Sequence, residues 1–111
     1  MESILTSTKK LCGGISEEDT TFDDELIIHI NTVLALVQQA INIGPENGFF
    51  IEGKTETWSD FVNSDNKYFR MIRTYVPAKV RYIFDPPTGA AMEALKETIK
   101  ELEWRLNIAA E

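Results

Sequence analysis

The chain has 111 residues, of which 43% are apolar and 26% charged, and its formal net charge at pH 7 is −7. This length and composition fit a single globular domain over residues 1–111 and exclude a largely disordered chain. The acidic balance argues against general nucleic-acid binding, because affinity for phosphates depends on a surplus of lysine and arginine.

A short helix is expected from Ser3 to Leu11. Ile4, Leu5 and Leu11 would form its apolar side, and the glycine pair at 13–14 would end it. We interpret this helix as a packing element.

Acidic residues dominate the next segment, at 17–19 and again at 23–25. Carboxylates near a helix N-terminus are stabilising, so we interpret these residues as caps and as a solvated face. A calcium loop would need ligands at alternate positions around a central glycine, and this spacing is absent.

A long helix is predicted over residues 24–43, ending at Gly44-Pro45. Its wide apolar surface predicts the central helix of a bundle, covered on several sides. The stripe consists of Leu26, Ile30, Val33, Val37 and Ile41, with Ile27, Leu34 and Ala40 beside it and Ile28 and Leu36 on other faces. His29, the only histidine, has no recognisable catalytic partner, so we assign it a structural or surface role.

Residues 44–57 contain four glycines or prolines and the apolar run Phe49-Phe50-Ile51. This pattern predicts a long loop that carries a brief strand or a hairpin arm. Residues 57–62 then form a helical turn, whose apolar side is Trp58, Phe61 and Val62. We expect Trp58 to anchor the core.

The third long helix is predicted over residues 65–85. Its core face is Phe69, Ile72, Val76, Val80 and Ile83, and tyrosines recur every seven residues at 68, 75 and 82. Pro77 removes one backbone donor and is expected to kink or split this helix. Arg70, Arg73 and Arg81 share a basic face. This face is the best candidate for a nucleic-acid contact, but ion pairs to acidic residues of the same or a neighbouring subunit fit the acidic chain better.

The last helix follows Pro86-Pro87 and has two apolar faces. Met92, Leu95, Ile99, Leu102 and Leu106 are spaced alternately by three and four residues, which predicts a seam against the subunit's own bundle. Trp104 and Ile108 lie on the opposite side. A second apolar face that carries a tryptophan indicates a contact with another protein.

No sequence motif for catalysis or for cofactor binding is present, such as a glycine-rich phosphate loop, a nucleophile elbow or a metalloprotease helix. The single cysteine, Cys12, cannot form an intrachain disulfide, and no Cys/His cluster fits a metal ion. No apolar run reaches the roughly 20 residues that span a bilayer. We therefore expect an all-α protein with no enzymatic activity, cofactor, metal or membrane contact, assembled in a reducing cytoplasm.

The charges are unevenly distributed along the chain. Residues 1–66 hold twelve acidic and three basic residues, whereas residues 67–111 hold six acidic and eight basic residues. Such polarity suits head-to-tail self-association, in which an acidic surface of one copy meets a basic surface of the next.

Several of these segments together resemble one protein family. They are 31–33, Gly44-Pro45 with Gly48-Phe49, 57–61, the end of the third long helix at 80–87 and the end of the last helix at 103–107. In this order, with four or five helices and a loop arm between the second and third long helices, the chain resembles the head-tail connector proteins of tailed bacteriophages. The similarity covers nearly the whole chain, and its motifs concern packing, not catalysis.

The resemblance implies a compact bundle that forms a ring beneath the phage portal and offers a docking surface to the tail or a stopper protein. It implies a place in the virion neck, assembly in the bacterial cytoplasm, and DNA only as a passing, non-specific cargo. Trp104, Ile108, Arg70, Arg73, Arg81, Phe49 and Phe50 are the candidate interaction residues. The alternatives are another phage neck or tail-completion protein, a small DNA-associated packaging or regulatory protein, and a helical adaptor unrelated to phages.

Overall fold

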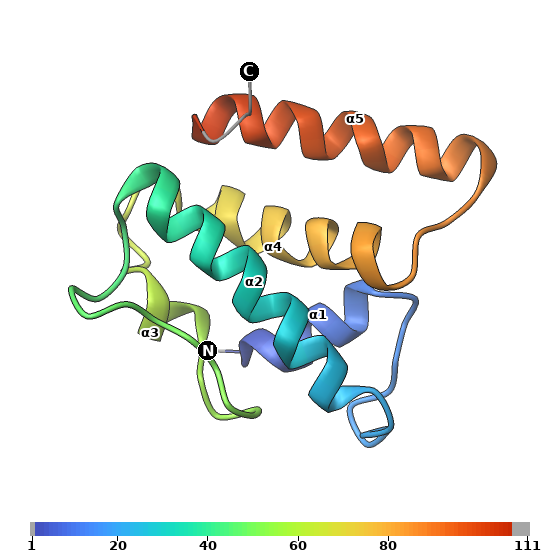
Figure 1. Cartoon of the computed structure of the whole chain (residues 1–111), viewed down its shortest axis with the longest axis horizontal. Helices are drawn as coiled ribbons and strands as arrows, with labels where there is room; N and C mark the ends of the chain where they lie inside the picture. Colours follow the sequence, from blue (N-terminus) through green and yellow to red (C-terminus); the bar gives the residue numbers. More distant parts are fainter. Residues whose placement is uncertain (1, 108–111) are drawn as a thin grey trace.

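The computed structural model describes residues 2–107, and in this part of the chain the secondary structure is entirely helical. The helices are α1 (Ile4–Leu11), α2 (Asp23–Ile41), α3 (Trp58–Phe61), α4 (Phe69–Phe84) and α5 (Gly89–Leu106) (Figure 1). The described residues include no strand, and one isolated bridge joins Ser3 to Thr57. The predicted all-α fold class is confirmed.

The four longer helices form a layered arrangement around α4. In Figure 1, α2 crosses α4 obliquely, α1 lies beneath them, and α5 runs along α4 on the side away from α1. The core lies where α1, α2, α3 and α4 meet, and its largest fully buried side chains include Trp58, Tyr75, Ile4, Leu26, Ile30, Leu34 and Ile72.

α1 begins and ends where the sequence predicts. The Ser3 hydroxyl accepts a hydrogen bond from the Thr6 amide at 2.9 Å, which caps the N-terminus. Gly13 and Gly14 have positive φ angles and end the helix. The placement of Leu11 on the apolar side is wrong, because its side chain is 54% exposed at the last residue of the helix.

α2 buries one stripe and leaves another exposed. Leu26, Ile30, Val33 and Val37 are fully buried, and Ile41 is half-buried. The prediction that α2 is covered on several sides is wrong for the face that carries Ile28 and Leu36, whose side chains are 64% and 48% exposed. Ala40 is exposed too. α1 and α4 pack on the other side of the helix and do not reach this face.

The segment Phe49-Phe50-Ile51, called the arm below, has no regular secondary structure and pairs with no strand in the described residues. Its backbone is held by two side chains of α2 instead. The Asn31 amide donates to the Ile51 carbonyl and accepts from the Ile51 amide, at 3.0 and 2.8 Å. Gln38 makes the same two bonds with Phe49, at 2.8 and 2.7 Å. Of the two predicted alternatives, the long loop is confirmed and the short strand is wrong. Primary amides make the backbone hydrogen bonds that a neighbouring strand would otherwise make.

α3 forms the predicted turn. Thr57 and Asp60 make a reciprocal capping box at its N-terminus. Trp58 is 1% exposed, and its indole N–H donates to the Ser7 hydroxyl at 2.7 Å, which joins α3 to α1. The prediction that Trp58 anchors the core is confirmed.

α4 starts four residues later than predicted. The side chains of Asn63 and Asn66 accept hydrogen bonds from the amides two residues further on, which favours turns over helix in this segment. From Phe69 the helix continues through Pro77 to Phe84, so it is not split. Ile83, predicted on the core face, is 43% exposed near the end of the helix.

α5 packs chiefly on α4. Of its predicted seam, Ile99 and Leu106 are buried, whereas Met92, Leu95 and Leu102 are half-buried. The seam faces the bundle as expected, but it is shallow because α5 packs chiefly on a single helix, α4.

Candidate interaction surfaces

The outer face of α5 carries Trp104, whose side chain is 70% exposed. This exposed fraction is the highest among the large apolar side chains of the described residues. Ile108, the second residue predicted on this face, lies outside the described residues. The apolar surface of so exposed a tryptophan is removed from water only when another molecule covers the side chain.

The orientation of α5 is fixed by a polar contact on its inner side. The Tyr75 hydroxyl donates to the Glu103 carboxylate at 2.8 Å, and the Lys79 ammonium lies 3.1 Å from the same oxygen. Burial, followed by the hydrogen bond and the charge of Glu103, raises the pKa of Tyr75 well above its ordinary value. Successive residues of a helix are turned by about 100°, so the contact of Glu103 with Tyr75 and Lys79 of α4 directs the next residue of α5, Trp104, away from α4.

A hollow between α1 and the first half of α4 is lined by three cationic side chains, Lys10, Arg70 and Arg73. We call it the basic groove. Its volume is about 580 Å³, and Glu2, Ser7, Leu11, Trp58 and Thr74 complete its lining. Glu2, the one acidic residue among them, forms an ion pair with Lys10. The groove thus has a net positive charge on an acidic chain.

The three arginines of the predicted basic face differ in their surroundings. In the described part of the chain, no carboxylate lies within ion-pair distance of Arg70, Arg73 or Arg81. The Arg73 guanidinium lies over the Phe69 ring, 5.7 Å from its centroid. Ion pairs within one subunit, one of the two predicted arrangements, are therefore absent for these arginines among residues 2–107.

Arg81 is not part of the basic groove lining. It is half-buried, and its Nε atom is buried without a hydrogen-bond partner in the described residues. Its charge acts on the buried thiol of Cys12, where burial raises the pKa to about 11 against the opposing effect of Arg81. Only Arg70 and Arg73 are therefore available together as one surface.

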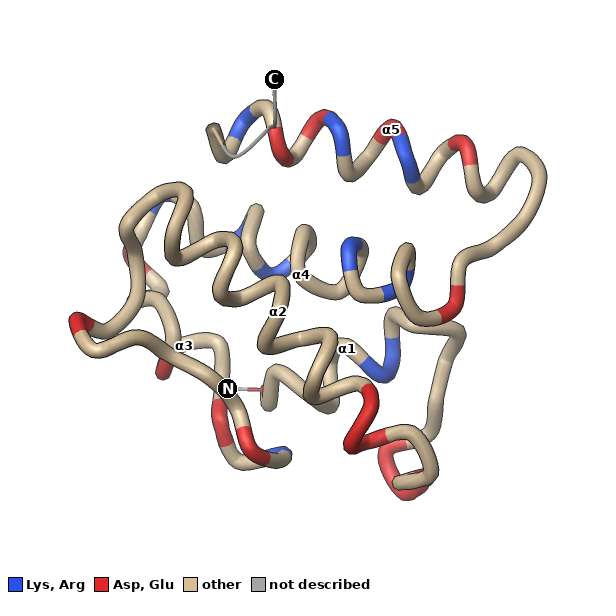
Figure 2. Tube along the Cα trace, viewed as in Figure 1, with Lys and Arg blue, Asp and Glu red and all other residues tan. Residues whose placement is uncertain are grey.

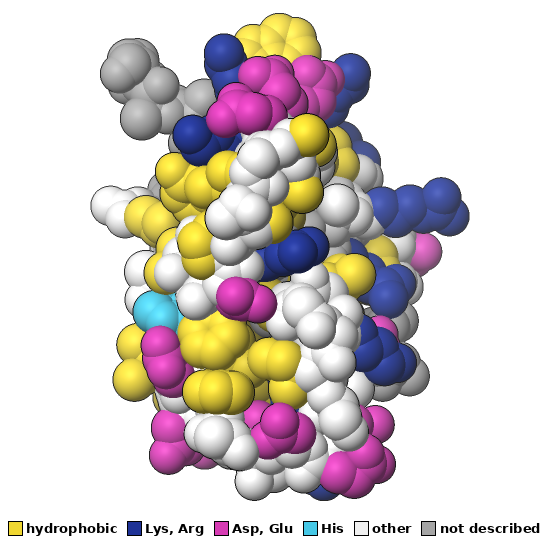
Figure 3. All heavy atoms as spheres, turned by 90° about the vertical axis from the view of Figure 1, so that its right-hand side faces the viewer, with side chains coloured by type: hydrophobic (Ala, Val, Ile, Leu, Met, Phe, Trp, Pro, Cys, Tyr) yellow, Lys and Arg dark blue, Asp and Glu magenta, His cyan; other side chains and the backbone are white. Residues whose placement is uncertain are grey.

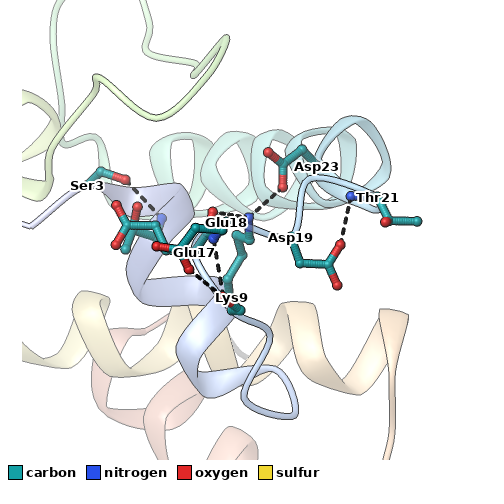
Figure 4. A network of polar contacts seen from close by, with 9 residues as sticks. Ser3, Lys9, Glu17, Glu18, Asp19, Thr21 and Asp23 are labelled. Atoms are coloured by element: carbon teal, nitrogen blue, oxygen red, sulfur yellow. Dashed lines mark hydrogen bonds and ion pairs between the residues drawn. The ribbon is translucent and has the colours of Figure 1, made fainter.

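An exposed turn between α1 and α2 carries Glu17, Glu18 and Asp19, and we call it the acidic turn. The buried side chain of Lys9, which is 3% exposed, holds this turn in place. Its ammonium nitrogen lies 2.9 Å from a carboxylate oxygen of Asp23 and donates to the Glu17 carbonyl at 3.2 Å (Figure 4). Figure 2 shows acidic residues gathered along this edge and basic residues along α4, while α5 carries both signs.

The two aromatic residues of the arm behave differently. Phe49 is half-buried and packs on Phe61, with ring centroids 5.1 Å apart. Phe50 is 62% exposed. The arm therefore uses Phe49 to attach to the subunit and leaves only Phe50 free for a partner.

Sequence reasoning missed a further apolar surface at the start of α2. Phe22 packs on Phe84 with ring centroids 5.5 Å apart, and His29 lies 6.2 Å from the same ring. Figure 3 shows apolar side chains beside the histidine on this side of the molecule. Ile28 and Leu36 extend the exposed apolar character of α2, and their place outside its main stripe was the signal available in the sequence.

The surfaces described so far are candidate contact surfaces, and the described residues contain no group of three or more potential metal ligands. The sequence model of a family described as Phage connector protein matches residues 4–111. The chain belongs to this family. No curated protein and no solved structure matches the chain.

The phage connector family is a family of structural proteins, and membership of it indicates a role as a phage head-tail connector. This connector has no helix, among those the structure describes, long and apolar enough to cross a membrane. The residues that the sequence predicts as interaction residues lie in separate places: Trp104 on α5, Arg70 and Arg73 in the basic groove, Arg81 beside Cys12, and Phe49 and Phe50 in the arm.

Proposed function

We propose that the connector forms a ring beneath the phage portal and provides the surface on which the tail or a stopper protein docks. The observation that carries the proposal is the 70% exposure of Trp104 on a helix that is anchored from its opposite side. Exposed aromatic residues of this size are frequent centres of protein interfaces. The family match supplies the setting, because a phage connector has other head and tail proteins as its neighbours.

A ring needs two different, mutually complementary surfaces on each subunit. The described residues offer the basic groove on one surface and the acidic turn on another. Trp104 on α5 and Phe50 in the arm are exposed on other elements. A subunit with separate surfaces of this kind can contact its neighbours in the ring and still present a surface to the portal or the tail.

Assembly of this kind requires binding energy alone. Each contact can be weak, because closing a ring on a portal template adds the contributions of many identical interfaces. We expect the isolated chain to be monomeric in dilute solution and to assemble on the portal. DNA would pass through without specific contacts, since a chain with a net charge of −7 repels phosphates overall.

The test is to mix the purified connector with purified portal and to score ring formation by electron microscopy and sedimentation. Wild type is expected to form a ring on the portal, and Trp104→Ala is expected to weaken that association at least tenfold while the monomer stays folded. Lys100→Ala is the matched control, because it shortens another exposed side chain of α5 without removing an aromatic ring. Equal portal binding by wild type and Trp104→Ala would contradict the role of this surface.

A further inference from the structure

We propose that the acidic turn of one connector subunit docks in the basic groove of the next subunit. This inference rests on the proposed ring and names the two surfaces that join its neighbours. The partner is a second copy of this chain, recognised by carboxylates that face guanidinium groups.

Two of the three cations in the basic groove have no counterion in the described residues. Glu2 forms an ion pair with Lys10, which leaves the Arg70 and Arg73 guanidinium groups without a carboxylate in the described part of the subunit. A guanidinium group presents its donors in a planar fork that matches a carboxylate. Two such forks on the wall of a hollow of about 580 Å³ are suited to acidic side chains that enter from outside.

The groove combines these charges with a partly apolar lining. Trp58 and Leu11 contribute to it, and the Phe69 ring holds the Arg73 guanidinium at a centroid distance of 5.7 Å. A cation held over an aromatic ring keeps a defined position while its donors remain available. The groove is therefore preorganised for an anionic partner.

The acidic turn is equally preorganised, and Figure 4 shows its polar contacts. The Ser16 hydroxyl donates to Glu18 at 2.7 Å, and the Thr21 amide donates to Asp19 at 3.1 Å. Hydrogen bonds from Ser16 to Glu18, and from the side chain and amide of Thr21 to Asp19, lower the pKa of both carboxyl groups and so favour their ionised forms. With Lys9 bound to the Glu17 carbonyl beneath it, the turn loses little freedom when it binds.

The acidic turn and the basic groove form no ion pair with each other in the described part of one subunit. α1 separates them: Leu5, Thr6 and Lys9 line the hollow beside the acidic turn, whereas Ser7, Lys10 and Leu11 line the basic groove. In the described residues, no ion pair joins the turn to Lys10, Arg70 or Arg73. Two complementary surfaces on different sides of one subunit produce a head-to-tail contact, which closes into a ring when the rotation between neighbours permits it.

The test uses charge reversal on the full chain. The groove variant is Arg70→Glu with Arg73→Glu, the turn variant is Glu17→Lys with Glu18→Lys and Asp19→Lys, and the swap variant carries all five changes. Each of the first two is expected to lower connector self-association at least tenfold, measured by sedimentation at high protein concentration and by ring formation on the portal. The swap variant is expected to restore association, because a basic turn then faces an acidic groove.

The matched control is Lys96→Glu with Lys100→Glu, which reverses two cations on the exposed side of α5 and leaves the groove unchanged. Far-UV circular dichroism identifies any variant that has unfolded, and the swap variant tests the pairing even if one half-reversed variant is unstable. The control is expected to self-associate like wild type.

The outcomes separate this inference from the proposed ring. If wild type forms rings on the portal and both half-reversed variants do so equally well, the ring stands and the pairing is wrong. If wild type forms no ring, the ring proposal fails, while restored self-association in the swap variant still supports the contact between copies. If the groove variant loses binding to duplex DNA but keeps self-association, the groove binds phosphate and the pairing is overturned.

Discussion

The two tryptophans of this connector occupy opposite kinds of environment. Trp58 is 1% exposed, donates a hydrogen bond to Ser7 and lies where α1, α3 and α4 meet. Trp104 is 70% exposed on α5, a helix that packs chiefly on α4. The first region holds the subunit together, whereas the second presents a surface while a few contacts fix its orientation. Substitutions in the two regions should therefore affect different measurements.

The largest effect is expected for Trp58→Ala. Removing a buried aromatic side chain costs about 3–5 kcal/mol of folding free energy, because it leaves a cavity as well as lost apolar burial. Chemical denaturation followed by circular dichroism measures this loss. Trp58→Phe, which keeps most of the ring but removes the donor to Ser7, should cost less. A small effect of Trp58→Ala would contradict the assignment of this residue to the core.

The next effect concerns the attachment of the arm to α2. Asn31→Ala together with Gln38→Ala removes four hydrogen bonds to the arm backbone, which should cost about 2–4 kcal/mol at roughly 1 kcal/mol per bond. Hydrogen exchange of the Phe49 and Ile51 amides should accelerate more than exchange in the core. Gln39→Ala, at an exposed neighbouring position, is the control and should leave the exchange unchanged.

A smaller effect is expected where α5 is anchored to α4. Tyr75→Phe removes the hydrogen bond to Glu103 and should cost about 1 kcal/mol at neutral pH. Burial and Glu103 raise the pKa of Tyr75 above its ordinary value of 10.0, so the neutral phenol is favoured in the folded state. The stabilisation that the neutral Tyr75 phenol gives to the folded state is complete below pH 10 and decreases as the pH rises further.

The pH dependence of unfolding, measured from pH 8 to pH 11.5, tests this contribution. Wild type should lose more stability in the alkaline range than Tyr75→Phe. Burial raises the pKa of Cys12 to about 11, so ionisation of this thiol at alkaline pH destabilises both proteins. The difference between the two stability curves therefore reports the contribution of Tyr75. Parallel curves for the two proteins would contradict the buried contact between Tyr75 and Glu103.

The smallest effect on stability is expected for Trp104→Ala, within about 0.5 kcal/mol, as for most exposed positions. Its fluorescence should be that of Trp58 alone and therefore blue-shifted, because a buried indole has little contact with water. Portal association is the measurement in which this variant should differ from wild type. If the monomer unfolds, Trp104 belongs to the core and the outer face of α5 was misinterpreted.

Much of this contrast was predictable from local patterns. The spacing of three and four residues along α5 placed its seam toward the bundle and Trp104 away from it. The spacing of Trp58, Phe61 and Val62 predicted the turn that carries Trp58. Periodicity is reliable here because both faces lie on one continuous helix or turn, so their relative direction follows from helix geometry alone.

Other features depended on distant partners and could not be predicted in this way. Ile28 and Leu36 are exposed because the neighbouring helices pack on the other side of α2, although their apolar character favours burial. The arm is paired with Asn31 and Gln38, which no strand propensity indicates. The late start of α4, by contrast, has a local cause that the helical periodicity does not show, because the side chains of Asn63 and Asn66 favour turns.

The sequence by itself determined the helical class, the approximate positions of the helices, the burial of Trp58 and the family to which the connector belongs. The tertiary structure alone decided which charges share a surface: it placed Lys10 of α1 beside Arg70 and Arg73 of α4, excluded Arg81 from the basic groove, and put the acidic turn on another side of α1. Helix geometry fixes the direction of a side chain relative to its own helix. The packing of one helix on another is needed to bring side chains from distant segments together.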